Sequence, residues 1–261
     1  MATPAPNSPA LMPDILFSAL AVPGLGWLIF AAFLAGLVRG FTGFGSALVY
    51  LPIAAQFLSP VWVLVTLVLK DVLGPLPNLP RARRDSNMAQ VGWMALGMVL
   101  AMPLGLMALY TIDPLVFRYT VSICALTVPL ILMAGFRYRG AMSRPLLLGT
   151  GAASGFFGAA AGVPGPPVIL LYLSSNAPAS RIRANAMIYL LIFDISLLAM
   201  LGLQGQMALL PVALGLLLVA PAMLGSVVGG SVFRSENARL YRVAGYSITM
   251  GAALVGLPLW D

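Results

Sequence analysis

The sequence GLVRGFTG at residues 36–43 recurs as GAASGFFG at residues 151–158, which is 115 residues further along the chain. Both stretches fit the pattern G-x-x-x-G-F-x-G, and both lie within long apolar sequence. Two weaker matches follow in the same order, residues 95–103 with 213–221 and residues 117–118 with 241–242. Matches in the same order indicate that the chain is a duplicated unit.

The composition predicts a membrane protein. The chain is 61% hydrophobic and only 8% charged, whereas soluble domains contain about 25% charged residues. Apolar runs recur along the whole length, so we expect a single all-α membrane domain over residues 1–261. The chain has no histidine, and its single cysteine is Cys124, so we expect no internal disulfide, no metal site and no cofactor. The net charge of +7 is interpreted as a topology signal and not as a nucleic-acid surface.

Two breaks interrupt the apolar sequence, at residues 39–45 and 161–167. The short apolar pieces that follow them, residues 46–58 and 168–173, fall well below the roughly 20 residues that span a bilayer. Each piece is interpreted as one arm of a helical hairpin whose tip is the break. The remaining apolar segments are predicted at residues 15–38, 61–75, 88–110, 114–136, 145–160, 182–203, 207–232 and 237–259.

The loop charges predict the topology. The basic clusters are Arg81/Arg83/Arg84, Arg137/Arg139/Arg144, Arg181/Arg183 and Arg234/Arg239. The connections near Ser59, Asp113 and Gln204 are neutral or acidic. If each hairpin returns to the side from which it came, all four clusters lie on one side, which we take as cytoplasmic, and both termini are periplasmic. Each half then crosses an odd number of times, which predicts inverted-topology repeats over residues 14–136 and 145–259.

Four charged residues lie away from the loops: Arg39, Lys70, Asp71 and Asp194. An ionisable group in the hydrocarbon costs at least about 2.5–3.5 kcal/mol, so it marks either a pathway or a buried pair. In one interpretation the four pair statically and lock the two halves together. In the other, Arg39 and Lys70 contact an anionic substrate while Asp71 or Asp194 takes up a proton. Because Lys70 and Asp71 are adjacent, we expect them not to share a helix face and to need separate partners.

The glycines of the breaks are candidates for an anion site. A helix that restarts inside a membrane exposes backbone N–H groups and the positive end of its dipole, which favours anions. The candidate substrate-binding residues beside Arg39 and Lys70 are Gly43, Gly45, Ser46, Gly162 and Gly165. For Gly36/Gly40 and Gly151/Gly155 we expect a different role, because small residues at this spacing allow helices to pack closely.

The segments at residues 36–52 and 155–167 resemble the two signature motifs of the sulfite exporter TauE/SafE family, which run G-x-x-x-G-x-x-G-x-G-G with a following proline, once in each half. The resemblance extends over nearly the whole chain. The sequence differs in having Ser46 where a further glycine is usual and an alanine-rich stretch at residues 159–161. The resemblance implies a bacterial inner-membrane transporter for sulfite, sulfoacetate and other sulfur-containing anions or organic acids.

The sequence thus predicts a secondary transporter for small anions, in which Asp71 or Asp194 couples transport to protons. Its expected partners are the anion and the lipid bilayer. A non-transporting membrane scaffold or assembly factor, and an anion channel, stay as alternatives. An enzyme is not expected, because intramembrane hydrolysis needs a nucleophile together with a base or a metal. The chain has no histidine and only seven carboxylate side chains that could supply the base or the metal ligands.

Overall fold

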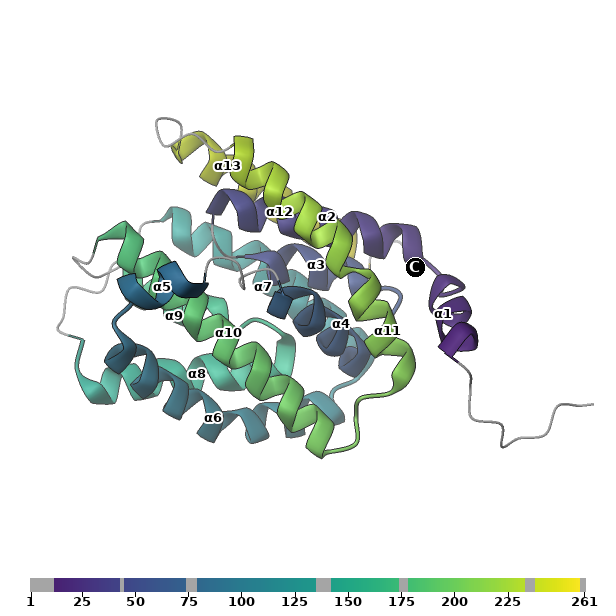
Figure 1. Cartoon of the computed structure of the whole chain (residues 1–261), viewed down its shortest axis with the longest axis horizontal. Helices are drawn as coiled ribbons and strands as arrows, with labels where there is room; N and C mark the ends of the chain where they lie inside the picture. The colour runs from purple at the N-terminus through teal and green to yellow at the C-terminus, as the bar shows by residue number, and fades with distance from the viewer. Residues whose placement is uncertain are drawn as a thin grey trace, which may run out of the picture.

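The computed structural model describes residues 12–42, 45–73, 79–134, 142–173, 178–232 and 238–258. Within these ranges every regular element is a helix (Figure 1). The helices are α1 Met12–Leu20, α2 Leu25–Thr42, α3 Ser46–Ala54, α4 Pro60–Leu73, α5 Leu79–Asp85, α6 Met88–Thr111, α7 Pro114–Met133, α8 Arg144–Ala161, α9 Gly165–Leu173, α10 Ala179–Leu203, α11 Leu209–Leu217, α12 Val219–Val232 and α13 Ala238–Gly256.

The outer helices carry an apolar surface suited to lipid. Among the described residues, four helical stretches are long and apolar enough to cross a bilayer: Met88–Thr111, Pro114–Met133, Ser180–Leu203 and Leu209–Ser231. Large apolar side chains on the outside of α6, including Leu100, Leu104 and Met107, are exposed. A soluble protein seldom exposes such a continuous apolar face. The predicted all-α membrane class is therefore confirmed.

Several boundaries differ from the predicted segments. The first segment begins with a separate helix, α1, because the chain turns at Gly24, whose φ is +76°. The basic stretch after α4 forms a short helix, α5. The segment predicted at residues 207–232 is divided at Leu218 into α11 and α12. Pro221 explains this division, since it has no N–H to donate to the carbonyl of Leu217 four residues earlier.

Two helix pairs approach closely enough for backbones to touch. α2 lies along α12, and α8 lies along α6 (Figure 1). A Cβ atom added at Gly36 would collide with the carbonyl of Ala222, and one added at Gly151 would collide with the carbonyl of Met94. Gly40 and Gly155, one turn further on, are equally tight against α12 and α6. The packing role predicted for these four glycines is confirmed.

The second sequence match, residues 95–103 with 213–221, does not describe equivalent places. Gly97 packs against the backbone of Leu148 in α8, whereas Gly215 packs against α4. The contact most like that of Gly97 is made by Gly225, which packs against the backbone of Phe33 in α2. The two matched glycines therefore make different contacts.

Candidate functional site

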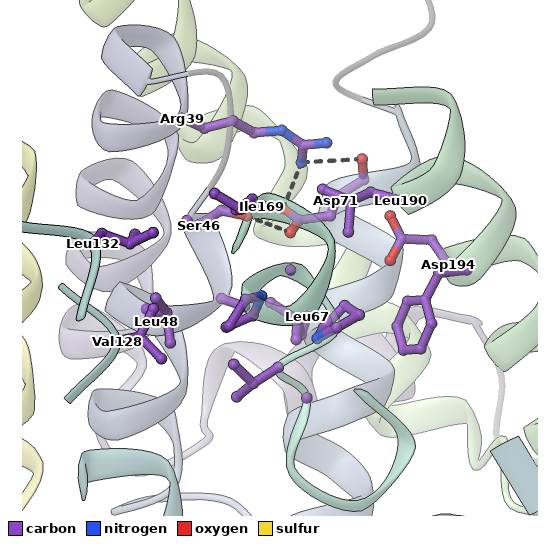
Figure 2. A pocket seen from close by; sticks show the side chains of 18 residues that line it. Arg39, Ser46, Leu48, Leu67, Asp71, Val128, Leu132, Ile169, Leu190 and Asp194 are labelled. Atoms are coloured by element: carbon purple, nitrogen blue, oxygen red, sulfur yellow. Dashed lines mark hydrogen bonds and ion pairs between the residues drawn. The ribbon is translucent and has the colours of Figure 1, made fainter. Parts of the chain in front are cut away.

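A single cavity joins the two helix breaks. Its wall includes Gly45 from the first break, Ser46 at the start of α3 and residues 162–166 from the second break, and the cavity is partly open to the outside (Figure 2). Residues of both breaks therefore lie at the same cavity. Gly43, the remaining candidate, lies outside the described residues.

Each break is shaped by a glycine in the left-handed region. Gly45 has φ +89° and immediately precedes α3, and Gly162 has φ +71° and caps α8. Residues with a side chain rarely adopt this conformation. After each break the chain restarts as a short helix, as predicted, although α3 ends at Ala54 and α9 already begins at Gly165, inside the predicted break. Gly165, the first residue of α9, also lines the cavity.

Arg39, Ser46 and Asp71 form a connected polar group on the cavity wall. The Nη1 atom of Arg39 lies 3.1 Å from Oδ1 of Asp71 and donates to the backbone carbonyl of Asp71 at 3.3 Å. The hydroxyl of Ser46 donates to Oδ2 of Asp71 at 2.7 Å. α2, α3 and α4 each supply one of these residues, so the group ties the first break to the adjacent helix (Figure 2).

Lys70 is the fourth member of this group, but it does not line the cavity. Its side chain is fully buried, and Nζ lies 2.7 Å from Oδ1 of Asp71. Nζ also lies 4.7 Å from the ring centre of Tyr50, whose hydroxyl donates to Thr66 at 2.9 Å. The expectation that Lys70 and Asp71 need separate partners was wrong. The rule on helix faces concerns Cβ positions, and the flexible four-carbon stem of lysine reaches around the helix.

Asp194 lines the same cavity from α10. The residue is 7% exposed. Among the residues that the structure describes, its carboxylate receives no hydrogen bond and no ion pair, and Figure 2 shows it on the Asp71 side of the cavity. A static lock therefore accounts for three of the four intramembrane charges and leaves Asp194 unpaired within the described chain.

The remaining wall is apolar and was missed in the sequence. Val128 and Leu132 from α7, with Ile169, Leu190 and Phe193, surround the polar group. In a membrane protein such side chains look the same as lipid-facing ones, so only the neighbouring charge at Asp194 could have pointed to Phe193. A pocket with apolar walls and a few convergent polar groups suits a small ligand. The polar part offers a guanidinium, a hydroxyl and the N-terminus of α3, all of which favour an anion.

Comparison with known proteins agrees with this chemistry. A sequence model of the family "Sulfite exporter TauE/SafE" matches residues 28–255. No curated protein and no solved structure matches the chain. The matched region contains both helix breaks and every residue of the cavity wall. The chain therefore belongs to the sulfite exporter TauE/SafE family of multi-pass membrane proteins that transport sulfur-containing anions.

Proposed function

We propose that this protein is a secondary transporter that moves sulfite, organosulfonates or related small organic acids across the bacterial inner membrane, and that the cavity between the two breaks is its substrate site. The observation that carries the proposal is the cavity wall itself. A guanidinium, a hydroxyl at a helix start and the carboxylate of Asp194, which has no ion-pair partner within the described chain, converge there between two broken helices. Discontinuous helices at a charged cavity are typical of secondary transporters.

Arg39 is the principal charged contact in this proposal. Its Nη1 atom makes both of its contacts to Asp71, and in this proposal the planar guanidinium fork binds a sulfonate, sulfite or carboxylate group. Gly45 and Ser46 contribute the start of α3, and Gly162 and Gly165 contribute the opposite wall. Gly43 is a further candidate for this site from the sequence. Lys70 acts from behind Asp71 by holding its carboxylate in place, because it does not reach the wall.

Charge balance supports a role for Asp194 in proton coupling. Arg39 and Lys70 carry two positive charges, and Asp71 and Asp194 carry two negative charges when all are ionised. An anion that enters adds a negative charge in a medium where uncompensated charge is costly. Proton uptake by Asp194 restores neutrality, so anion and proton travel together. Asp71 is the less suitable carrier, since two cations and Ser46 already contact its carboxylate.

Inverted repeats provide the scaffold for alternating access in this proposal. Gly36 of α2 packs against α12 in the same way as Gly151 of α8 packs against α6. Gly40 and Gly155 make matching contacts with the same two helices. These matches support repeats over residues 14–136 and 145–259. Both termini are then periplasmic, although residues 1–11 and 259–261 lie outside the described part. The exposed arginines at the proposed cytoplasmic ends are Arg83, Arg84, Arg144, Arg181 and Arg183.

Reconstitution in proteoliposomes tests the function against its alternatives. A carrier gives saturable sulfite flux that is accelerated by sulfite on the opposite side, a channel gives flux without that acceleration, and a scaffold gives none. Acidifying the side that holds the anion increases the flux if protons are co-transported. Absence of flux for sulfite, alkyl sulfonates and small carboxylates alike would refute the proposal.

A further inference from the structure

We propose that Asp71 is a tethered surrogate for the transported anion: in the empty carrier its carboxylate occupies the donors of Arg39 and Ser46, and the substrate binds by displacing it. This inference rests on the proposed function, because it concerns the same cavity. It adds that the carboxylate of Asp71 competes with the substrate. It predicts that removing the charges of Asp71 and of its partner Lys70 together tightens substrate binding.

The contacts of Asp71 are those that an oxyanion would make. Its two oxygens are bound separately, Oδ1 by the guanidinium of Arg39 at 3.1 Å and Oδ2 by the hydroxyl of Ser46 at 2.7 Å. All three residues line the cavity. The only cation on the described cavity wall is therefore already engaged by a carboxylate. An anion that is to contact Arg39 and Ser46 must compete with that carboxylate.

A second cation makes the displacement feasible. Removing one partner from a buried ion pair usually leaves an unpaired charge, at a cost of several kcal/mol. Asp71 avoids this cost, because Lys70 contacts Oδ1 at 2.7 Å from the side away from the cavity. When Arg39 and Ser46 turn to the substrate, the Asp71–Lys70 pair remains and is neutral. Lys70 is kept in place by the ring of Tyr50, and the hydroxyl of Tyr50 is fixed on Thr66.

The exchange also selects among anions. A ligand with two or more acceptor oxygens can replace both contacts of the Asp71 carboxylate, those from Arg39 and Ser46, at once. A halide offers one centre and cannot bridge the two donors as the carboxylate does. A neutral ligand gives Arg39 no charge in return for Asp71. Oxyanions such as sulfite or a sulfonate are therefore favoured over chloride.

A double variant separates this inference from direct binding by Lys70. Sulfite affinity is measured by isothermal titration calorimetry on detergent-purified protein. In K70M, displaced Asp71 has no second partner, so we expect weaker binding. In K70M/D71N the surrogate charge is gone, and we expect a Kd about tenfold below that of the wild type. A decrease of less than about threefold in the double variant overturns the inference, because a lysine that contacts the substrate directly predicts weak binding in both variants.

Two controls keep the result interpretable. If K70M/D71N is not monodisperse on size exclusion, K70Q/D71N takes its place with the same threshold, because its two amides can bond to each other. R39Q, made in the wild type and in the double variant, reports on the proposed site. Loss of sulfite binding in both R39Q proteins supports the site whatever the double variant shows. Unchanged binding in R39Q refutes the site itself.

Discussion

The hydroxyl of Ser154 donates a hydrogen bond to the carbonyl oxygen of Pro164, 2.5 Å away, and thereby ties α8 to the break that follows it. Ser154 is fully buried, so water cannot replace the bond. The bond fixes the second break at the point where Gly162 reverses the backbone. The cavity wall at Pro164 thus depends on Ser154, which is not itself part of that wall.

Replacing Ser154 by alanine is expected to lower the free energy of unfolding by about 1–3 kcal/mol, because the buried carbonyl of Pro164 loses its donor. Thermal melting in detergent measures the change. Ser231→Ala is the matched control, since the Ser231 hydroxyl is exposed and bonds within its own helix to Val228. Equal melting temperatures for the two variants would contradict the role assigned to Ser154.

Gly162→Leu is expected to abolish transport while the protein remains in the membrane. The left-handed backbone at φ +71° disfavours a side chain, and a Cβ atom would press against Leu51 at 2.9 Å. Gly149→Leu is the control, because a Cβ atom there meets no atom within 4 Å. Flux assays with expression measured by immunoblot test both. Normal flux through Gly162→Leu would show that the break tolerates a side chain.

Arg39→Gln is expected to reduce sulfite flux about tenfold or more at normal expression, because the charged donor on the wall is lost. Arg39→Lys should also be impaired, since a point charge does not reproduce the planar fork. Arg84→Gln, on the exposed face of α5, should transport normally. Wild-type flux in Arg39→Gln would remove Arg39 from the substrate site.

Asp194→Asn is expected to flatten the pH dependence of flux, because the amide cannot carry a proton. The comparison variant is Asp85→Asn, which lies on an exposed position of α5 and should leave the pH profile unchanged. Initial rates in proteoliposomes across a range of pH measure both. If Asp71→Asn and Asp194→Asn both keep the full wild-type pH dependence, these carboxylates are structural and coupling lies elsewhere.

Cysteine labelling tests the proposed topology. In a Cys124→Ala background, single cysteines at positions 5 and 261 should react with an impermeant reagent added to intact cells, and one at position 83 should not. The reason is the one-sided distribution of basic loop residues. Reaction at position 83 would invert or disprove the assignment.

Composition was sufficient to predict the helical membrane class, because a chain with so few charges cannot cover itself with a wetted surface. The glycine pattern predicted close packing at Gly36 and Gly151, but not the partners, since spacing along one helix says nothing about which helix crosses it. In the structure the charged residues Arg39, Asp71 and Asp194 line one cavity. That outcome follows from their shared need to avoid lipid.

The sequence could not reveal what depends on side-chain reach. Lys70 turns back onto its neighbour Asp71 because its stem is long enough, and no periodicity records that choice. The apolar wall from α7 was equally hidden, because Val128 and Leu132 are the kind of residue that also faces lipid. The division at Leu218 had a visible cause in Pro221, yet Pro103 lies inside the unbroken α6, so a proline alone does not determine where a membrane helix ends.

The glycine contacts of α2 with α12 and of α8 with α6 have a consequence for how the molecule can move. At these positions one backbone rests directly on the other, with no side chain between them to slide or change rotamer. Each of these two glycine contacts joins a helix from one half of the sequence to a helix from the other half. The rigid units of any rocking motion are therefore composites of both halves. For the same reason, a chain cut between residues 134 and 142 leaves two fragments that must assemble together, because each lacks the helices against which its own glycines pack.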